Sequence, residues 1–189
     1  MVVFDATILI ALLHPNGRPP RCRGTNLPVD GFEDRIDFLI ETLERQREKI
    51  IIPAPVLSEI LVHADRAGTG YLHELSNAAV FRPVPFDERA AVEVAAMARM
   101  RRESGGLPRR DGQTFAKLKY DRQIVATAIV ERASAIYSDD GDIKALGDRH
   151  GIPVIRIEDL PLPPVPPQME ISFHENAGSI TDERDDKED

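Results

Sequence analysis

Acidic residues recur in this chain beside short apolar runs, at Asp5, Glu59, Asp121 and Asp140. When carboxylates share one cleft, each pair at about 4 Å repels by about 4 kcal/mol at an effective dielectric of about 20. A divalent cation relieves this repulsion, and a ligand set made only of oxygen atoms favours Mg²⁺ or Mn²⁺. The residue types therefore predict metal-assisted hydrolysis of a phosphoryl bond, provided that the fold brings the four acids together.

The elements that must position these acids are short strands followed by helices. Apolar runs a few residues long predict strands at 2–5, 50–53, 78–86, 135–138 and 152–157. The spacing of apolar residues predicts helices at 7–13, 32–49, 55–68, 87–106, 120–133 and 143–150, with Gly68 as the stop of the third. Alternating strands and helices are typical of a three-layer α/β/α fold with a mostly parallel central sheet. Residues that follow the strands of such a sheet meet at its carboxyl edge, where ligands bind.

Length and composition predict one folded domain, residues 1–160, and a short tail. The chain has 189 residues, of which 42% are hydrophobic and 30% charged, which suits a single globular core. A Pro-, Gly- and Arg-rich insertion at 15–35 predicts a loop, and the Pro-rich, acidic residues 161–189 predict a disordered tail. The lone Cys22 excludes an internal disulfide and a cysteine-based zinc site. With no leader or membrane-spanning run evident, we expect a cytoplasmic protein without membrane contact.

The charge is distributed unevenly along the chain. The net charge is −8, and residues 168–189 contribute eight acids against two bases, or −6, which leaves −2 for the rest. Residues 99–122 carry eight basic side chains against three acids, or +5. A basic stretch beside an acidic site predicts phosphate binding, although basic helix ends and loops are also commonly just solvated.

Four short motifs carry the acids. They are FDAT with Asp5 and Thr7, PAPVLSEIL with Glu59, DRQIVATA with Asp121, and SDD with Ser138 and Asp140. Their order and spacing over residues 1–158 resemble those of PIN-domain ribonucleases, particularly the VapC-type toxins of toxin–antitoxin pairs. Each motif alone is weak, whereas the set is fairly specific.

The resemblance implies a role for each matching residue. Asp5, Glu59, Asp121 and Asp140 would be catalytic residues that hold one or two Mg²⁺ or Mn²⁺ ions. Accessory contacts would come from Thr7, Ser138 and Asp142, with Asp139 turned away. The implied activity is endoribonuclease cleavage that leaves 5′-phosphate and 3′-hydroxyl ends, with no histidine as general base.

The resemblance also implies partners. RNA would be the substrate, and a cognate antitoxin protein and a second copy of the chain are the expected protein partners. We assign RNA contacts to the basic stretch, at Arg109, Arg110, Lys117, Lys119 and Arg122.

Other interpretations remain open at this point. Asp5 suits a strand-end turn, Thr7 and Asp121 suit helix caps, and Glu59 suits an exposed helix face. A haloacid-dehalogenase-like phosphatase would use Asp5 as nucleophile, but that family needs a second Asp where Thr7 stands. A non-catalytic PIN-like module that binds RNA or protein is the remaining alternative.

Overall fold

The structure is a computed structural model, and it describes residues 1–14, 17–64, 68–103 and 115–164. Two predicted RNA contacts, Arg109 and Arg110, lie outside the described residues, as does the tail from residue 165 onward.

A parallel sheet lies at the centre of the described residues. Its five strands are β1 (Val2–Phe4), β2 (Ile50–Pro53), β3 (Phe81–Val84), β4 (Ile136–Tyr137) and β5 (Val154–Ile155). Their order is β3-β2-β1-β4-β5, and every neighbouring pair is parallel. All residues of β1 and β2 are buried, as expected for β-branched runs in a parallel sheet covered on both faces.

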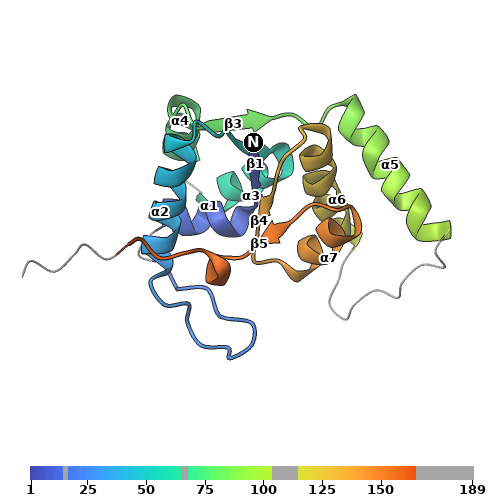
Figure 1. Ribbon diagram of the computed structural model, residues 1–189. Helices are drawn as coiled ribbons and strands as arrows, with labels where there is room; N and C mark the ends of the chain where they lie inside the picture. Colours follow the sequence, from blue (N-terminus) through green and yellow to red (C-terminus); the bar gives the residue numbers. More distant parts are fainter. Residues whose placement is uncertain (15–16, 65–67, 104–114, 165–189) are drawn as a thin grey trace, which may run out of the picture.

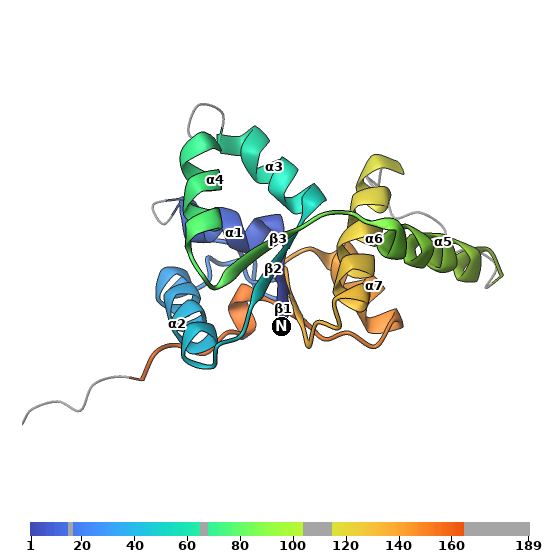
Figure 2. The same ribbon diagram turned by 90° about the horizontal axis from the view of Figure 1, so that it is seen from above.

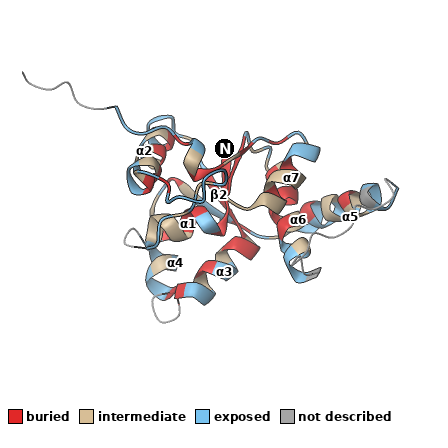
Figure 3. Cartoon of the chain, turned by 90° about the horizontal axis from the view of Figure 1, so that it is seen from below, coloured by how far each residue is buried: buried red, intermediate tan, exposed pale blue. Residues whose placement is uncertain are grey.

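Helices cover both faces of the sheet. Figures 1 and 2 show α1 (Ala6–Leu13), α2 (Phe32–Arg45), α3 (Ala54–Ala64) and α4 (Gly68–Asn77) on one side. On the other side lie α5 (Glu88–Glu103), α6 (Phe115–Val130) and α7 (Gly141–Arg149). Buried residues concentrate where these helices meet the strands (Figure 3). The predicted three-layer α/β/α fold is confirmed, and no helix in the described ranges is long and apolar enough to cross a membrane.

Several predicted boundaries were wrong. Helix α6 begins at Phe115 rather than near residue 120. This start was missed in the sequence analysis because the first turns of the helix are largely exposed and lack an apolar pattern. Asp121 therefore lies well inside the helix, which rules out the helix-cap interpretation. Gly68 begins α4, a helix that was not predicted and in which Leu75 is the one large buried side chain. The last two strands are two residues long each.

The insertion after α1 is anchored to the domain. An antiparallel bridge joins Arg21 to Pro28, and Val29 is buried. The backbone N–H of Arg23 donates to Glu158 Oε2 at 3.1 Å, in the short 3₁₀ helix η2 (Ile157–Asp159). Leu160 is also buried, so the folded domain extends at least to that residue.

Candidate active site at the carboxyl edge of the sheet

The pairing of β1 with β4 places Asp5 beside Ser138. Phe4 is aligned with Tyr137, so the next residue of each strand lies at the same edge of the sheet. The backbone N–H of Asp5 donates to the Tyr137 carbonyl at 3.0 Å, which extends the alignment by one residue. The buried Ser138 hydroxyl then donates to Asp5 Oδ2 at 2.7 Å. Thr7, on the first turn of α1, donates to the same oxygen at 3.3 Å.

Burial governs the protonation of Asp5. The residue is 5% exposed, and this burial raises its pKa from 3.8 to about 6. The hydrogen bond from Ser138 opposes that rise, while the negative charges of Asp140 and Glu59 add to it. Asp5 is thus a buried carboxyl group that interacts with the charges of Asp140 and Glu59 and accepts hydrogen bonds from two hydroxyl groups.

Asp121 lies on the buried face of α6. Residues three, four and seven positions later, Ile124, Val125 and Ala128, are all buried, so Asp121 shares their face. It is 5% exposed, and its Oδ2 atom is buried without a hydrogen-bond partner. Burial and then the charge of Asp140 raise its pKa to about 7, against the opposing charge of Lys117. A polar oxygen left unpaired in this way is costly unless a ligand satisfies it.

Asp140 is ion-paired, unlike Asp121. As the N-cap of α7, it accepts a hydrogen bond at Oδ1 from the Asp142 backbone N–H at 2.6 Å. Its Oδ2 lies 2.9 Å from Lys117 Nζ. Burial by itself would raise its pKa, but the Lys117 ammonium and the backbone N–H groups at the helix start outweigh burial and lower the pKa.

Lys117 bridges two acids of the SDDGD cluster. Its ammonium lies 2.9 Å from Asp140 Oδ2 and 2.8 Å from Asp142 Oδ2. Partial burial lowers its pKa, yet the two carboxylates raise it above the ordinary value, so it stays charged. From the sequence we assigned Lys117 to RNA binding. Its contact with the acids could not be predicted from the residue pattern, because Lys117 lies 23 positions before Asp140.

The remaining predicted site residues lie at the periphery of this group of acids or point away from it. Glu59 is exposed on α3, and its charge reaches Asp5. Lys119 is exposed and Arg122 is half-buried, both on α6. Asp139 turns toward η2, where its Oδ1 accepts a hydrogen bond from the Ile157 backbone N–H at 2.9 Å.

The donor set suits a hard divalent cation in chemical type. Every candidate ligand is an oxygen, and the unpaired Asp121 oxygen and the Lys117 ammonium both mark places where positive charge is favourable. In the described part of the chain, however, no three acidic, histidine or cysteine side chains stand close enough to hold one ion. The site as it stands is an electrostatically coupled group of acids with one built-in ammonium.

Sequence comparison identifies the family. The PIN domain model matches residues 25–148, more than half of the chain, and the chain therefore belongs to the PIN domain family. The match includes Glu59, Asp121 and Asp140 and begins after Asp5 and Thr7. Among curated proteins, none is recognisably similar in sequence.

Solved structures share the fold at low sequence identity. VapBC2 from Rickettsia felis, bound to promoter DNA, is 13% identical, with a TM-score of 0.55 over 82% of this chain and 98% of the other. FitAcB from Neisseria gonorrhoeae is 17% identical, with a TM-score of 0.54 over 85% and 100%. DNA-bound VapBC from Salmonella typhimurium is 12% identical, with a TM-score of 0.52 over 82% and 97%. The fold is thus that of VapC-type PIN domains.

Proposed function

We propose that this chain is a divalent-metal-dependent endoribonuclease that acts as the toxin of a toxin–antitoxin pair. The observation that carries the proposal is the unpaired, buried Asp121 oxygen, in electrostatic contact with Asp140, Asp142 and Asp5. Such a group costs stability in the free protein, so it points to a cation that binds there.

The acids divide the work between binding and positioning. Asp5, Asp121 and Asp140 would hold Mg²⁺ or Mn²⁺, with Glu59 reaching in from α3. An ion bound there would supply Lewis-acid chemistry, lowering the pKa of a bound water and stabilising negative charge on the leaving oxygen of a phosphodiester. Ser138 positions the Asp5 carboxylate through its 2.7 Å hydrogen bond, and Thr7 positions it from α1. Lys117 keeps Asp140 ionised in the metal-free protein, at an oxygen for which a bound ion would compete.

Family membership and the similar structures support the substrate and partner. PIN domain membership supports a nuclease, and one similar structure of TM-score 0.50, VapC20 from Mycobacterium tuberculosis, is described as a toxin that cleaves the sarcin–ricin loop. Two others are VapBC complexes bound to DNA. By analogy with these proteins, we propose that this chain has an RNA substrate and an antitoxin partner.

The test is cleavage of labelled RNA by the purified full chain. We expect cleavage with Mn²⁺ or Mg²⁺, none with EDTA, and none by Asp5→Asn, which keeps the shape of the side chain and removes its charge. Asp148→Asn is the matched control, because Asp148 is an exposed α7 acid paired with Lys144. Undiminished cleavage by Asp5→Asn would contradict the proposal.

The second candidate is a PIN-like module that binds without cutting. The ion pairs of Lys117 favour it, because an ammonium already neutralises part of the charge that a metal would neutralise. The two candidates differ in metal binding: calorimetric titration with Mn²⁺ should detect a site in the nuclease and no site in the module.

A further inference from the structure

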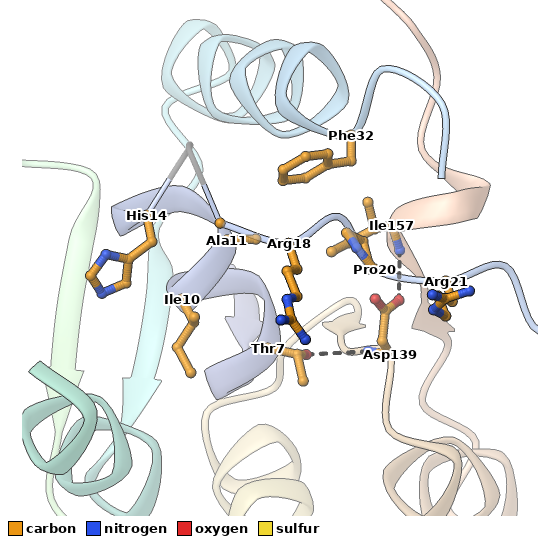
Figure 4. A pocket seen from close by; sticks show the side chains of 11 residues that line it. Thr7, Ile10, Ala11, His14, Arg18, Pro20, Arg21, Phe32, Asp139 and Ile157 are labelled. Atoms are coloured by element: carbon orange, nitrogen blue, oxygen red, sulfur yellow. Dashed lines mark hydrogen bonds between the residues drawn. The ribbon is translucent and has the colours of Figure 1, made fainter. Parts of the chain in front are cut away.

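A pocket lies beside Thr7, between α1 and the insertion (Figure 4). Its volume is about 390 Å³, within the range of about 300–1,000 Å³ that is usual for small-molecule sites. Thr7 connects the pocket to the candidate active site. Its hydroxyl donates to Asp5 Oδ2 at 3.3 Å and accepts from the Asp139 backbone N–H at 3.3 Å. A molecule bound in this pocket would therefore lie next to the carboxylates.

The pocket combines apolar walls with two guanidinium groups. The apolar walls come from Ile10, Ala11, Pro20, Phe32 and Ile157. The cations are Arg18 and Arg21 of the insertion, and Figure 4 shows the Arg18 side chain extending toward Thr7. An apolar surface with adjacent positive charge suits a ligand that has a flat ring and an anionic group.

The charged groups of the pocket are not balanced within it. No residue in the described ranges forms a hydrogen bond or ion pair with the Arg18 side chain. Arg21 donates from Nη1 to the Asn26 carbonyl at 2.7 Å, a neutral partner. Asp139 is the one carboxylate in the lining, and its Oδ1 accepts from the Ile157 backbone. The pocket thus carries two cations against one acid.

We propose that this pocket binds one nucleotide of the RNA substrate, beside the phosphodiester presented to Asp5. Arg18 would contact a phosphate and the apolar walls would contact the base or the sugar. The inference rests on the proposed ribonuclease function. It adds a binding role for the insertion, which was predicted from the sequence only to be a loop. RNA supplies both required features in each unit, an aromatic ring and an anion, whereas a protein segment would need an acidic side chain beside an apolar one.

The test measures RNA binding separately from cleavage. The full chain carrying Asp5→Asn keeps the RNA intact, and a fluorescein-labelled pool of random 12-mer RNA serves as the probe. Adding Arg18→Glu should weaken binding about tenfold and reduce the slope of log affinity against log salt by about one. The matched control is Arg45→Glu, an equal charge change at the exposed end of α2, about 20 Å along the helix from Phe32. It should change affinity less than about twofold.

A second variant tests shape without a change of charge. Ala11→Phe fills the pocket and should also weaken RNA binding about tenfold, while Ala91→Phe on the exposed face of α5 should not. Thermal unfolding establishes that each variant is folded. If Ala11→Phe is not folded, Arg18→Glu alone decides.

Each outcome decides between the two proposals. If the unmodified chain cleaves RNA with Mn²⁺ and Arg18→Glu leaves binding and cleavage unchanged, the pocket assignment is overturned and the ribonuclease proposal stands. If the Asp5→Asn chain binds the RNA in an Arg18-dependent way but the unmodified chain never cleaves it, the ribonuclease proposal fails and the nucleotide pocket stands.

Discussion

Asp121 and Asp140 lie in the same acidic group and are in opposite states. Asp140 is capped by backbone N–H groups and paired with Lys117, and its pKa is lowered. Asp121 is buried on α6 with one oxygen unpaired, and its pKa is raised to about 7. The comparison shows that the protein itself compensates the charge of Asp140 and leaves that of Asp121 largely uncompensated.

The uncompensated side also includes Asp5. Hydroxyl groups hold Asp5, and these orient a carboxylate without neutralising it. The ammonium of Lys117 contacts Asp140 and Asp142, and its charge offsets only part of the repulsion that Asp121 experiences from Asp5 and the other acids. A cation from solution would therefore be drawn to the Asp5 and Asp121 side of the site.

Between Asp121 and Asp140, the larger expected effect comes from Asp121→Asn. It should lower metal-dependent RNA cleavage by at least about 100-fold, because loss of a metal ligand costs more than the 10- to 100-fold typical of loss of a residue that supports one. Initial cleavage rates with Mn²⁺ measure this, with Asp148→Asn as the control. Equal rates for Asp121→Asn and the unmodified chain would mean that the unpaired oxygen has no part in the reaction.

The pH dependence of stability should separate the two sides of the site. Because the folded pKa values of Asp5 and Asp121 lie above the ordinary value of 3.8, the folded state binds protons more tightly than the unfolded state. The free energy of unfolding of the metal-free protein should therefore decrease as pH rises from about 4 to about 7. Asp121→Asn should remove part of that decrease, on the order of 4 kcal/mol at pH 8, because the pKa of Asp121 rises from 3.8 to about 7, with little change near pH 4.

Urea unfolding in EDTA at both pH values measures this effect. Asp148→Asn is again the control, because Asp148 is exposed and paired with Lys144. The raised pKa of Asp121 would be contradicted if the unmodified chain became more stable from pH 4 to pH 8 and Asp121→Asn were less stable than the unmodified chain at pH 8.

Removal of Lys117 should have an intermediate effect. Lys117→Gln frees Asp140 and Asp142 from their ammonium partner, and we expect Mn²⁺ to bind roughly three- to tenfold more tightly, since a cation and the ammonium compete for the same oxygens. Calorimetric titration of the full chain measures the affinity. Lys144→Gln, which breaks the Lys144–Asp148 pair on α7, is the matched control and should leave it unchanged. Weaker Mn²⁺ binding by Lys117→Gln would show that Lys117 supports the site rather than competes within it.

The smallest expected effect concerns the acidic tail. Removal of residues 165–189 deletes the segment of net charge −6 and should tighten RNA binding about twofold at low salt, with no change at high salt, because screening removes long-range repulsion. The cut belongs after residue 164, because Leu160 is buried and its carbonyl accepts a hydrogen bond from Arg35. Equal RNA affinities of the full and shortened chains at low salt would show that the tail does not affect RNA binding.

The sequence alone determined the layered fold and the order of the acidic motifs. Short β-branched runs such as Ile50–Ile52 suit the buried interior of a parallel sheet, and the helices between them cover its faces. That arrangement places Asp5 and Ser138 at the carboxyl edge of the sheet, whereas the pairing of their strands, β1 with β4, came only from the structure. Local patterns carried this information because periodic burial is a property of consecutive residues.

Only the tertiary structure decided how each charge is compensated. Lys117 and the insertion arginines carry no periodic signal, and a long flexible side chain can reach any of several partners. The start of α6 was missed for the same reason, since exposed turns have no apolar pattern to mark them. The state of Asp121 is decided by which groups surround its oxygen in space. Pairing at a distance of 23 residues, as between Lys117 and Asp140, depends on the packing of α6 against α7, which no local pattern records.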